Sequence, residues 1–316
     1  MSFWDGKKVL VTGGSGFLGS FVVEKLIGER SVSPENIIVP RSKNIDLRVW
    51  DNCVRAVKDA DVVIHVAGRG GGIGYNRKFP ASTFYDNIMM NTQLMEASRL
   101  EGVEKFVGIG TVCSYPKFTP VPFKESSIWD GYPEETNASY GLAKKMMLVQ
   151  SQAYKQQYGF NSIHLLMVNL YGPRDSFDPE NSHVIPALIV KFHRAKRHEE
   201  KYVTLWGTGK ATREFLFVGD AAEGVIAATE KYSKTDPVNI GCGKDISIKE
   251  LAKLVADLFS YTGEIRWDTT KPDGQPRRCL NVDRAKVQFG FEARTSLEDG
   301  LKSTIEWYRN EQERLR

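Results

Sequence analysis

The chain has 316 residues, of which 41% are apolar and 26% are charged, and its formal net charge is +4. This composition is typical of a globular protein whose core needs neither a disulfide nor a metal ion. It excludes low-complexity chains, and no basic run with interleaved aromatic residues indicates nucleic acid binding. The length accommodates one large α/β domain, or a nucleotide-binding domain with a smaller lobe.

The cysteine pattern and the hydropathy of the chain indicate the cellular compartment of the protein. Cys53, Cys113, Cys242 and Cys279 are scattered, without CxxC or Cys/His spacing, which argues against a zinc site or a disulfide framework. The N-terminal segment MSFWDGKKVL lacks the regions of a signal peptide, and no apolar run approaches the roughly 20 residues that span a bilayer. We therefore expect a cytoplasmic protein without membrane contact or bound metal.

The first 170 residues alternate short apolar runs with segments of helical periodicity. The expected strands are Lys8–Thr12, Ile37–Val39, Val62–Val66, Phe106–Ile109 and Ile163–Val168. The expected helices between them are Ser20–Gly28, Ala81–Glu101 and Leu142–Gln157. The strands are continuously apolar, as expected where helices cover both faces of a parallel sheet. The alternation predicts an α/β fold with a Rossmann-type doubly wound parallel sheet.

The remainder of the chain is richer in turns. We expect helices over Pro186–Arg194 and Asp220–Glu230, and a third helix that begins at Ser247, where SIKE has the form of a capping box. Residues 1–172 are therefore predicted to form the nucleotide-binding domain. Residues 173–316 are predicted to form a smaller, mostly helical substrate lobe, with some chain crossing between the two.

A glycine-rich turn directly follows the first expected strand and opens the first helix. Gly13, Gly16 and Gly19 have GxxGxxG spacing, which permits a tight turn, a close approach of backbone to pyrophosphate, and close packing of helix on strand. The helix N-terminus adds free N–H donors for the phosphates. We expect these glycines, with Phe17 and Leu18 between them, to bind a dinucleotide.

The end of the second expected strand indicates which dinucleotide. A carboxylate there would bind the ribose of NAD, whereas an arginine accommodates the 2′-phosphate of NADP. The strand is followed by Arg41, and no acidic residue occurs before Asp46. Arg41 can pair with a phosphate through two hydrogen bonds. A solvated basic turn is the alternative interpretation, and we favour NADP(H).

A Tyr-x-x-x-Lys pattern, Tyr140 to Lys144, begins the helix expected before the fifth strand. Spacing of four places both side chains on one helical face. A nearby ammonium favours phenolate, so Tyr140 is expected to exchange a proton near neutral pH.

Together, the glycine turn TGGSGFLG, the stretch TVCSYPK from Thr111 and the stretch YGLAK from Tyr140 resemble the extended short-chain dehydrogenase/reductases. Within them the chain is most similar to the GDP-L-fucose synthases, which are GDP-4-keto-6-deoxy-mannose 3,5-epimerase/4-reductases. The stretches that carry this likeness are ETN (135–137), NLYGP (169–173), NSHVIPAL (181–188), WGTG (206–209), REF (213–215) and KPDG (271–274). The likeness covers nearly the whole chain.

The resemblance implies that Thr111, Tyr140 and Lys144 form a reductase triad and that Cys113 and His183 form an epimerase pair. The chemistry agrees, because hydrogens at C3 and C5 of a 4-ketohexose lie α to the carbonyl. Their removal gives an enolate, which hydroxyl and ammonium groups stabilise. Inversion requires a base on one face and an acid on the other, and a thiolate and an imidazole suit these tasks near pH 7.

The resemblance also implies binding residues and an assembly. The expected NADP(H) contacts further include Ala67, Gly68, Asn169, Leu170, Lys144 and His183. The residues expected around the GDP of the substrate are Lys191, Trp206, Arg213 and Asp273. The helical stretches Ala81–Glu101 and Leu142–Gln157 correspond to the family's dimer contact, so a homodimer is expected.

Three rival interpretations stay open. The first is a C4 reductase of another GDP-4-keto sugar, a heptose or a dideoxyhexose, without full epimerase activity. The second is a sugar-nucleotide 4-epimerase with permanently bound NAD, although the second strand lacks the acidic end that this would require. The third is a regulatory protein that binds the cofactor without catalysis. A dehydratase is disfavoured, because Val112 and Cys113 stand where those enzymes have Asp-Glu.

Overall fold

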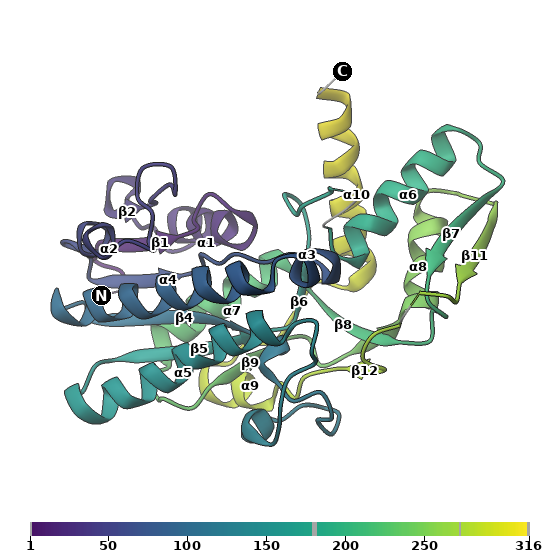
Figure 1. Ribbon diagram of the computed structural model, residues 1–316. Helices are drawn as coiled ribbons and strands as arrows, with labels where there is room; N and C mark the ends of the chain where they lie inside the picture. The colour runs from purple at the N-terminus through teal and green to yellow at the C-terminus, as the bar shows by residue number, and fades with distance from the viewer. Residues whose placement is uncertain (1, 179–181, 272, 315–316) are drawn as a thin grey trace.

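The computed structural model describes residues 2–178, 182–271 and 273–314. Its centre is a six-stranded sheet in the order β2-β1-β3-β4-β5-β9, in which every neighbouring pair is parallel (Figure 1). The strands are β1 (Val9–Thr12), β2 (Ile37–Ile38), β3 (Val62–His65), β4 (Lys105–Thr111), β5 (Ser162–Met167) and β9 (Val238–Ile240). The predicted Rossmann-type doubly wound sheet is confirmed.

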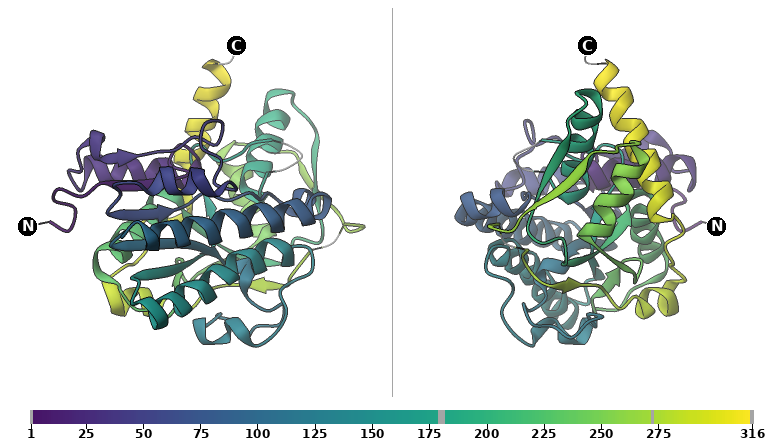
Figure 2. Two further views of the ribbon diagram at one scale, coloured as in Figure 1. Left: turned by 60° about the vertical axis from the view of Figure 1, so that its left-hand side comes forward. Right: turned by 90° about the vertical axis from the view of Figure 1, so that its right-hand side faces the viewer.

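Helices cover both faces of this sheet, as Figure 2 shows from two further directions. One layer consists of α1 (Phe17–Gly28), α7 (Val218–Lys231) and α9 (Asp283–Phe289). The other consists of α2 (Trp50–Val57), α4 (Pro80–Leu100) and α5 (Ala138–Tyr158). Each layer has its own buried apolar cluster against the sheet, which explains why the central strands are apolar on both faces.

The C-terminal lobe stands beside the carboxyl ends of the central strands (Figure 1). Its helices α6 (Val184–Arg197), α8 (Ile248–Leu258) and α10 (Leu297–Arg314) share a third apolar cluster. It also contains strands that the sequence analysis did not predict. These are β6 (Asn169–Tyr171), β8 (Thr212–Phe217), β10 (Asp245–Ser247) and β12 (Arg277–Arg278) in one sheet, and β7 (Tyr202–Trp206) with β11 (Glu264–Asp268) in another.

The chain crosses between the two parts, since α7, β9 and α9 follow residue 172 in sequence and belong to the large sheet layer. The expected capping box is present: the Ser247 hydroxyl accepts from the Glu250 N–H, and the Glu250 carboxylate accepts from the Ser247 N–H. No helix in the described ranges is long and apolar enough to cross a membrane. Asn181 and Pro272, which belong to two of the matching stretches, lie outside the described residues.

Four parallel strands end at the same edge of the sheet. Thr12, His65, Thr111 and Met167 are the last residues of β1, β3, β4 and β5. The chain passes from β1 to β2 on one side and then to β3 on the other, so the strand order reverses at β1. In open α/β sheets, ligands bind outside the carboxyl ends of the strands at such a point.

Candidate active site

A cavity of about 1130 Å³ opens at this edge, between the sheet and the C-terminal lobe. It is large enough for a dinucleotide and part of a second ligand. Most of the predicted site residues line it: Gly13, Gly16, Phe17, Leu18, Gly19, Arg41, Ala67, Gly68, Thr111, Cys113, Tyr140, Asn169, Leu170, His183 and Arg213. The fold therefore brings together residues that are up to 200 positions apart in the sequence.

The glycine turn forms one wall of the cavity and leaves no room for side chains. Gly13 has φ +69°, and a Cβ there would lie 2.9 Å from the Ala67 nitrogen. A Cβ at Gly19 would lie 2.1 Å from the Gly13 oxygen. The α1 N-terminus, capped at Gly16, has no side-chain hydrogen bond on its N–H groups. These observations fit a pyrophosphate that approaches the backbone and the end of the helix.

Basic side chains surround the end of β2. Arg41 lines the cavity there. Asp46, the first acidic residue after β2, forms hydrogen bonds with Arg48, with Nη2 to Oδ2 at 2.7 Å and Nε to Oδ1 at 3.0 Å. This contact lowers the pKa of Asp46. The Asp46 carboxylate is thus paired with the Arg48 guanidinium, and Arg41 lines the cavity next to this pair.

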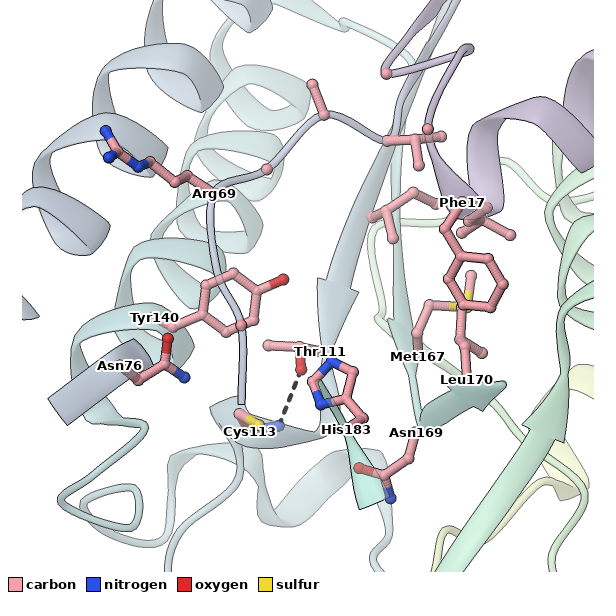
Figure 3. A pocket seen from close by; sticks show the side chains of 18 of the residues that line it. Phe17, Arg69, Asn76, Thr111, Cys113, Tyr140, Met167, Asn169, Leu170 and His183 are labelled. Carbon is pink, nitrogen blue, oxygen red and sulfur yellow. Dashed lines mark hydrogen bonds between the residues drawn. The ribbon is translucent and has the colours of Figure 1, made fainter. Parts of the chain in front are cut away.

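The YGLAK motif brings Tyr140 close to Cys113. A Cβ at Gly141 would lie 2.2 Å from the Cys113 carbonyl oxygen, so only glycine permits this approach of α5 to the turn after β4. The Ser114 hydroxyl donates to the Gly141 carbonyl at 2.8 Å and fastens the contact. Tyr140 and Cys113 consequently point into the same part of the cavity (Figure 3).

The surroundings of Tyr140 act on its pKa in the direction opposite to the nearby ammonium. Burial raises its pKa well above the ordinary value, and the nearby Cys113 raises it further. The charge of Lys144 does not offset these effects, because removing the phenol from water penalises its anion more strongly. Tyr140 is therefore a neutral phenol at pH 7 in this structure.

Lys144 lies beneath the cavity wall with 2% of its surface exposed. Its Nζ donates to the Ala67 carbonyl at 3.2 Å. A Cβ at Gly68 would lie 3.2 Å from the same Nζ, so the glycine leaves the ammonium close to the cavity. Burial lowers the pKa of Lys144 to about 8. The side chain is still largely charged at pH 7, and its charge is sensitive to mildly alkaline pH.

A chain of buried hydrogen bonds fixes the position of Ala67, whose carbonyl accepts from Lys144. Asn91 donates to the Ala143 carbonyl through Nδ2, so its Oδ1 accepts from His65 Nε2 at 2.9 Å. His65 Nδ1 is then an acceptor for the Thr12 hydroxyl at 2.7 Å, and the Thr12 oxygen accepts from the Ala67 N–H at 3.3 Å. Burial, together with the charge of Lys144, lowers the pKa of His65 to about 3, which keeps this tautomer neutral.

Thr111, Cys113 and His183 converge on the region that Tyr140 faces (Figure 3). The Thr111 hydroxyl oxygen accepts from the Cys113 N–H at 3.2 Å. His183 precedes the first turn of α6, and its ring is open to the cavity. Partial desolvation by the surrounding protein atoms lowers the pKa of His183 below its ordinary value. The imidazole is consequently neutral near pH 7 and able to take up a proton.

Two guanidinium groups lie on the lobe side of the same region. Arg213 donates to the Thr212 and Asp273 carbonyls. Arg278 donates to the Gln275 amide oxygen at 2.9 Å and to the Cys113 sulfur at 3.6 Å. Burial and the charge of Arg278 lower the pKa of Arg213 to about 10. Neither guanidinium has a carboxylate ion pair in the described part of the chain, an arrangement that suits an anionic ligand.

Four of the predicted residues do not line the cavity. Lys144 lies behind the wall, as described. Lys191, on α6, donates from Nζ to the Thr204 carbonyl at 2.9 Å. Trp206 is 69% exposed at the end of β7, with the Lys271 ammonium 5.7 Å from its ring centre. Asp273 accepts from the Thr208 N–H and hydroxyl, both at 2.6 Å. Trp206 and Asp273 thus belong to the lobe surface next to Arg213.

Some lining residues were missed by sequence reasoning. Arg278 follows the KPDG stretch by four positions and carries no motif of its own, while Asn76 follows a glycine-rich stretch. Glu134 directly precedes the matching ETN stretch, and Asn137 is its last residue. This stretch is the sequence feature that could have indicated both residues. Arg48, Arg69 and Asp86 form an ion-pair cluster that no local pattern indicates.

The doubly wound sheet, the glycine wall and the hydroxyl, phenol and ammonium beside it define a dinucleotide-dependent enzyme of the short-chain dehydrogenase type. Residues 9–241 match the model of the NAD dependent epimerase/dehydratase family, and the chain belongs to this family.

Relatives of known type resemble the chain over almost its full length. The probable GDP-L-fucose synthase 1 of Oryza sativa subsp. japonica is 40% identical over 308 residues, which cover 96% of this chain and 92% of that protein. A GDP-6-OMe-4-keto-L-xylo-heptose reductase from C. jejuni superposes with a TM-score of 0.91 at 28% identity, covering 98% of this chain and 100% of that chain. A GDP-L-fucose synthetase from Naegleria fowleri bound to NADP has a TM-score of 0.87 at 26% identity, covering 99% and 97%.

Proposed function

We propose that the chain is an NADPH-dependent 3,5-epimerase/4-reductase that converts GDP-4-keto-6-deoxy-D-mannose to GDP-L-fucose or a close GDP-sugar relative. One observation carries the proposal: a hydroxyl, a phenol, a sulfur and an imidazole line one cavity, from Thr111, Tyr140, Cys113 and His183. The glycine wall lies on one side of them, and the guanidinium groups of Arg213 and Arg278 lie on the other. The names of the similar proteins support the same substrate class.

NADP(H) is the cofactor that fits the wall near β2. Arg41 faces the cavity, and Asp46 is occupied by Arg48, so a 2′-phosphate meets positive charge and no free carboxylate. Bound NADPH supplies the hydride for C4 of the sugar. The solved relative that holds NADP supports this assignment, whereas a 4-epimerase with bound NAD would need a free acidic residue at this position.

Replacing the Arg41 guanidinium tests the cofactor assignment. Arg41→Ala is expected to raise the KM for NADPH about 10-fold or more, because a charge-assisted hydrogen bond to a phosphate contributes roughly 1.5–3 kcal/mol. The KM for NADH should change by less than about threefold, since NADH has no 2′-phosphate. Steady-state kinetics with both cofactors measures the effect. An equal loss for NADPH and NADH would assign Arg41 to another role.

Epimerisation requires proton transfer on both faces of the sugar. Cys113, as thiolate, removes the hydrogen α to the C4 carbonyl, while the Thr111 and Tyr140 hydroxyls donate to the developing enolate oxygen. His183 returns a proton to the opposite face of the sugar. The imidazole is neutral near pH 7, so it must first take up this proton. Because burial lowers the pKa of His183, the imidazolium then gives the proton up readily.

Reduction uses the neutral state of Tyr140. As hydride reaches C4, the ketone oxygen becomes an alkoxide, and the Tyr140 phenol gives it a proton. The raised pKa keeps this proton available at pH 7. The Lys144 ammonium, tied to the Ala67 carbonyl, stabilises the resulting phenolate. The guanidinium groups of Arg213 and Arg278 hold the diphosphate and orient the sugar.

The charge of Lys144 gives reduction a pH dependence. Its pKa is lowered to about 8, so the ammonium is present below pH 8 and is lost as the pH rises through that value. The rate of NADPH oxidation is therefore expected to fall up to about tenfold per pH unit above pH 8. Single-turnover rates with saturating NADPH between pH 6.5 and pH 9.5 would measure this. A Lys144→Met variant should be slow throughout and lack this alkaline decline, and a wild-type rate that is flat to pH 9.5 would contradict the assignment.

A C4 reductase of another GDP-4-keto sugar is the second candidate, favoured by the likeness to the C. jejuni heptose reductase. One experiment separates the two. Purified protein, GDP-4-keto-6-deoxy-D-mannose and NADPH are mixed in heavy water. The proposal predicts NADPH consumption with deuterium at C3 and C5 of the product. Consumption without deuterium would leave only a reductase, and no consumption would refute both activities on this sugar.

We also propose a cytoplasmic homodimer, joined through α4 and α5. These helices expose large apolar side chains at Phe84, Tyr85, Met146 and Val149, which are between 38% and 58% exposed. Exposed large apolar side chains on two adjacent helices are typical of an interface between copies. All four cysteines are free, as expected in a reducing compartment. Light scattering coupled to size exclusion measures the mass directly.

A further inference from the structure

One amide at the sugar end of the cavity has an oxygen without a partner. Asn76, on α3 (Ile73–Lys78), lines the cavity beside Tyr140 (Figure 3) and is 5% exposed. Its Oδ1 is buried and accepts no hydrogen bond from any described residue. Buried polar atoms in folded proteins are almost always paired, so an unpaired acceptor in a binding cavity indicates a donor on the ligand.

The orientation of this amide follows from its neighbours. A carboxylate only accepts hydrogen bonds, and Glu134 Oε2 accepts from the Thr136 hydroxyl at 2.6 Å and from Asn137 Nδ2 at 2.8 Å. Asn137 must therefore turn its oxygen away from Glu134. That oxygen accepts from Asn76 Nδ2 at 3.0 Å. The chain of donors and acceptors leaves Oδ1 as the free end of Asn76, and a flipped amide would place two oxygens against each other.

We propose that Asn76 Oδ1 accepts a hydrogen bond from a ring hydroxyl of the bound sugar and so determines which sugars the enzyme takes. The inference rests on the proposed function, which places a 4-keto-6-deoxyhexose between Tyr140 and Cys113. In that sugar C1 carries the diphosphate, C4 is the carbonyl, C5 carries hydrogen and C6 is a methyl group. Hydroxyl groups remain only at C2 and C3, and one of these two is the donor.

A hydrogen-bond acceptor at this position favours sugars that carry a hydroxyl group over sugars that do not. A sugar with a deoxy, fluoro or methoxy group at the contacted carbon has no proton to give, and it leaves Oδ1 buried and unpaired. A site built to pair with a hydroxyl rejects such analogues strongly, because the protein group loses its partner while it stays away from water. We expect a loss of affinity of about 10-fold to 100-fold for the analogue altered at that carbon.

Binding to the NADP⁺-loaded enzyme tests the proposal without turnover. The probes are GDP, GDP-L-fucose and its 2-deoxy-2-fluoro and 3-deoxy-3-fluoro analogues, titrated by calorimetry. Fluorine is close to hydroxyl in size and donates no hydrogen bond. One of the two analogues should bind wild type about 10-fold to 100-fold more weakly than GDP-L-fucose. In N76L, whose side chain is apolar and of similar volume, this gap should shrink to within about threefold, while GDP affinity stays unchanged.

The proposal is overturned if both analogues bind wild type as tightly as GDP-L-fucose does, or if N76L retains the wild-type gap. Equal binding of GDP and GDP-L-fucose would also overturn it, since the sugar would then make no favourable contact. N76A provides a second variant in case leucine disturbs α3, and an unchanged GDP affinity reports that the lobe is intact. Failure to oxidise NADPH with the 4-keto sugar would count against the proposed function alone. The role of Asn76 is tested separately, by the affinities of wild type and N76L for the sugar analogues.

Discussion

Tyr140→Phe should lower the rate of NADPH oxidation about 10²-fold to 10⁴-fold, which is the usual contribution of a positioned general acid. The phenol is the group placed to protonate the C4 alkoxide, and its raised pKa means that the proton is present across the neutral range. Phenylalanine removes this proton and keeps the ring. The measurement is a single-turnover rate with saturating NADPH and GDP-4-keto-6-deoxy-D-mannose.

Packing makes Tyr140→Phe a clean substitution. A Cβ at Gly70 would lie 3.3 Å from Tyr140 Cε2, so the loop after β3 rests against the ring and not against the hydroxyl. The substitution removes only the hydrogen bonds of the phenolic hydroxyl. The affinity for NADPH is therefore expected to stay within about threefold of wild type. Deuterium exchange at C3 and C5 should fall less than reduction, because Thr111 still donates to the enolate. A variant that reduces the sugar at more than a tenth of the wild-type rate would assign the proton to another group.

The parts of the site that local sequence could predict are those built from consecutive residues. The GxxGxxG turn needs only a strand before it and a helix after it, and Gly13 has the positive φ that such a turn demands. The spacing from Tyr140 to Lys144 is likewise a property of one helix. Cys113 and His183 are 70 positions apart, and only the likeness to a known family, not periodicity, placed them together.

The parts that escaped prediction depend on long-range contacts. Arg278 reaches the cavity because the two-residue strand β12 pairs with β8, and because buried Glu214 accepts from the Leu280 N–H at 2.6 Å. A strand of two residues has no periodicity to detect. The orientation of Asn76 is set by Glu134 and Asn137, which are about 60 positions away in sequence. No pattern in the glycine-rich stretch before Asn76 contains that information.

The ionisation state of Tyr140 shows the same limit. The sequence places an ammonium one turn away, which favours a phenolate. The fold buries the phenol, which disfavours the phenolate more strongly, and brings Cys113 close to it, which raises the pKa of Tyr140 further. A spacing rule detects the first effect only, because solvent exclusion belongs to the whole cavity.

Cys113→Ser should lower deuterium incorporation at C3 and C5 by about 10²-fold or more, because a serine hydroxyl is far less acidic than a thiol and provides no base near pH 7. NADPH oxidation should continue, since Thr111, Tyr140 and Lys144 are unchanged. The product would then be reduced at C4 but not inverted at C3 and C5. Mass spectrometry and proton NMR of the product in heavy water measure both properties.

Cys242→Ser is the matched control for this substitution. Cys242 does not line the cavity, its sulfur lies 3.4 Å from the Phe215 carbonyl, and burial raises its pKa to about 11, so it supplies no base at pH 7. Exchange and reduction should both stay near wild type. If Cys113→Ser exchanged deuterium as Cys242→Ser does, the base would have to be another group.

The roles of His183 as acid and Cys113 as base can be distinguished by what happens to the enolate in a variant that lacks the acid. A His183→Asn variant retains the Cys113 thiolate, so a hydrogen can leave and a deuteron can return from the same face. Such a variant should exchange deuterium without inverting the carbon, whereas Cys113→Ser should do neither. If both variants lost exchange equally, the two groups would act on the same proton, and the arrangement of sulfur and imidazole on opposite sides of the sugar would be wrong.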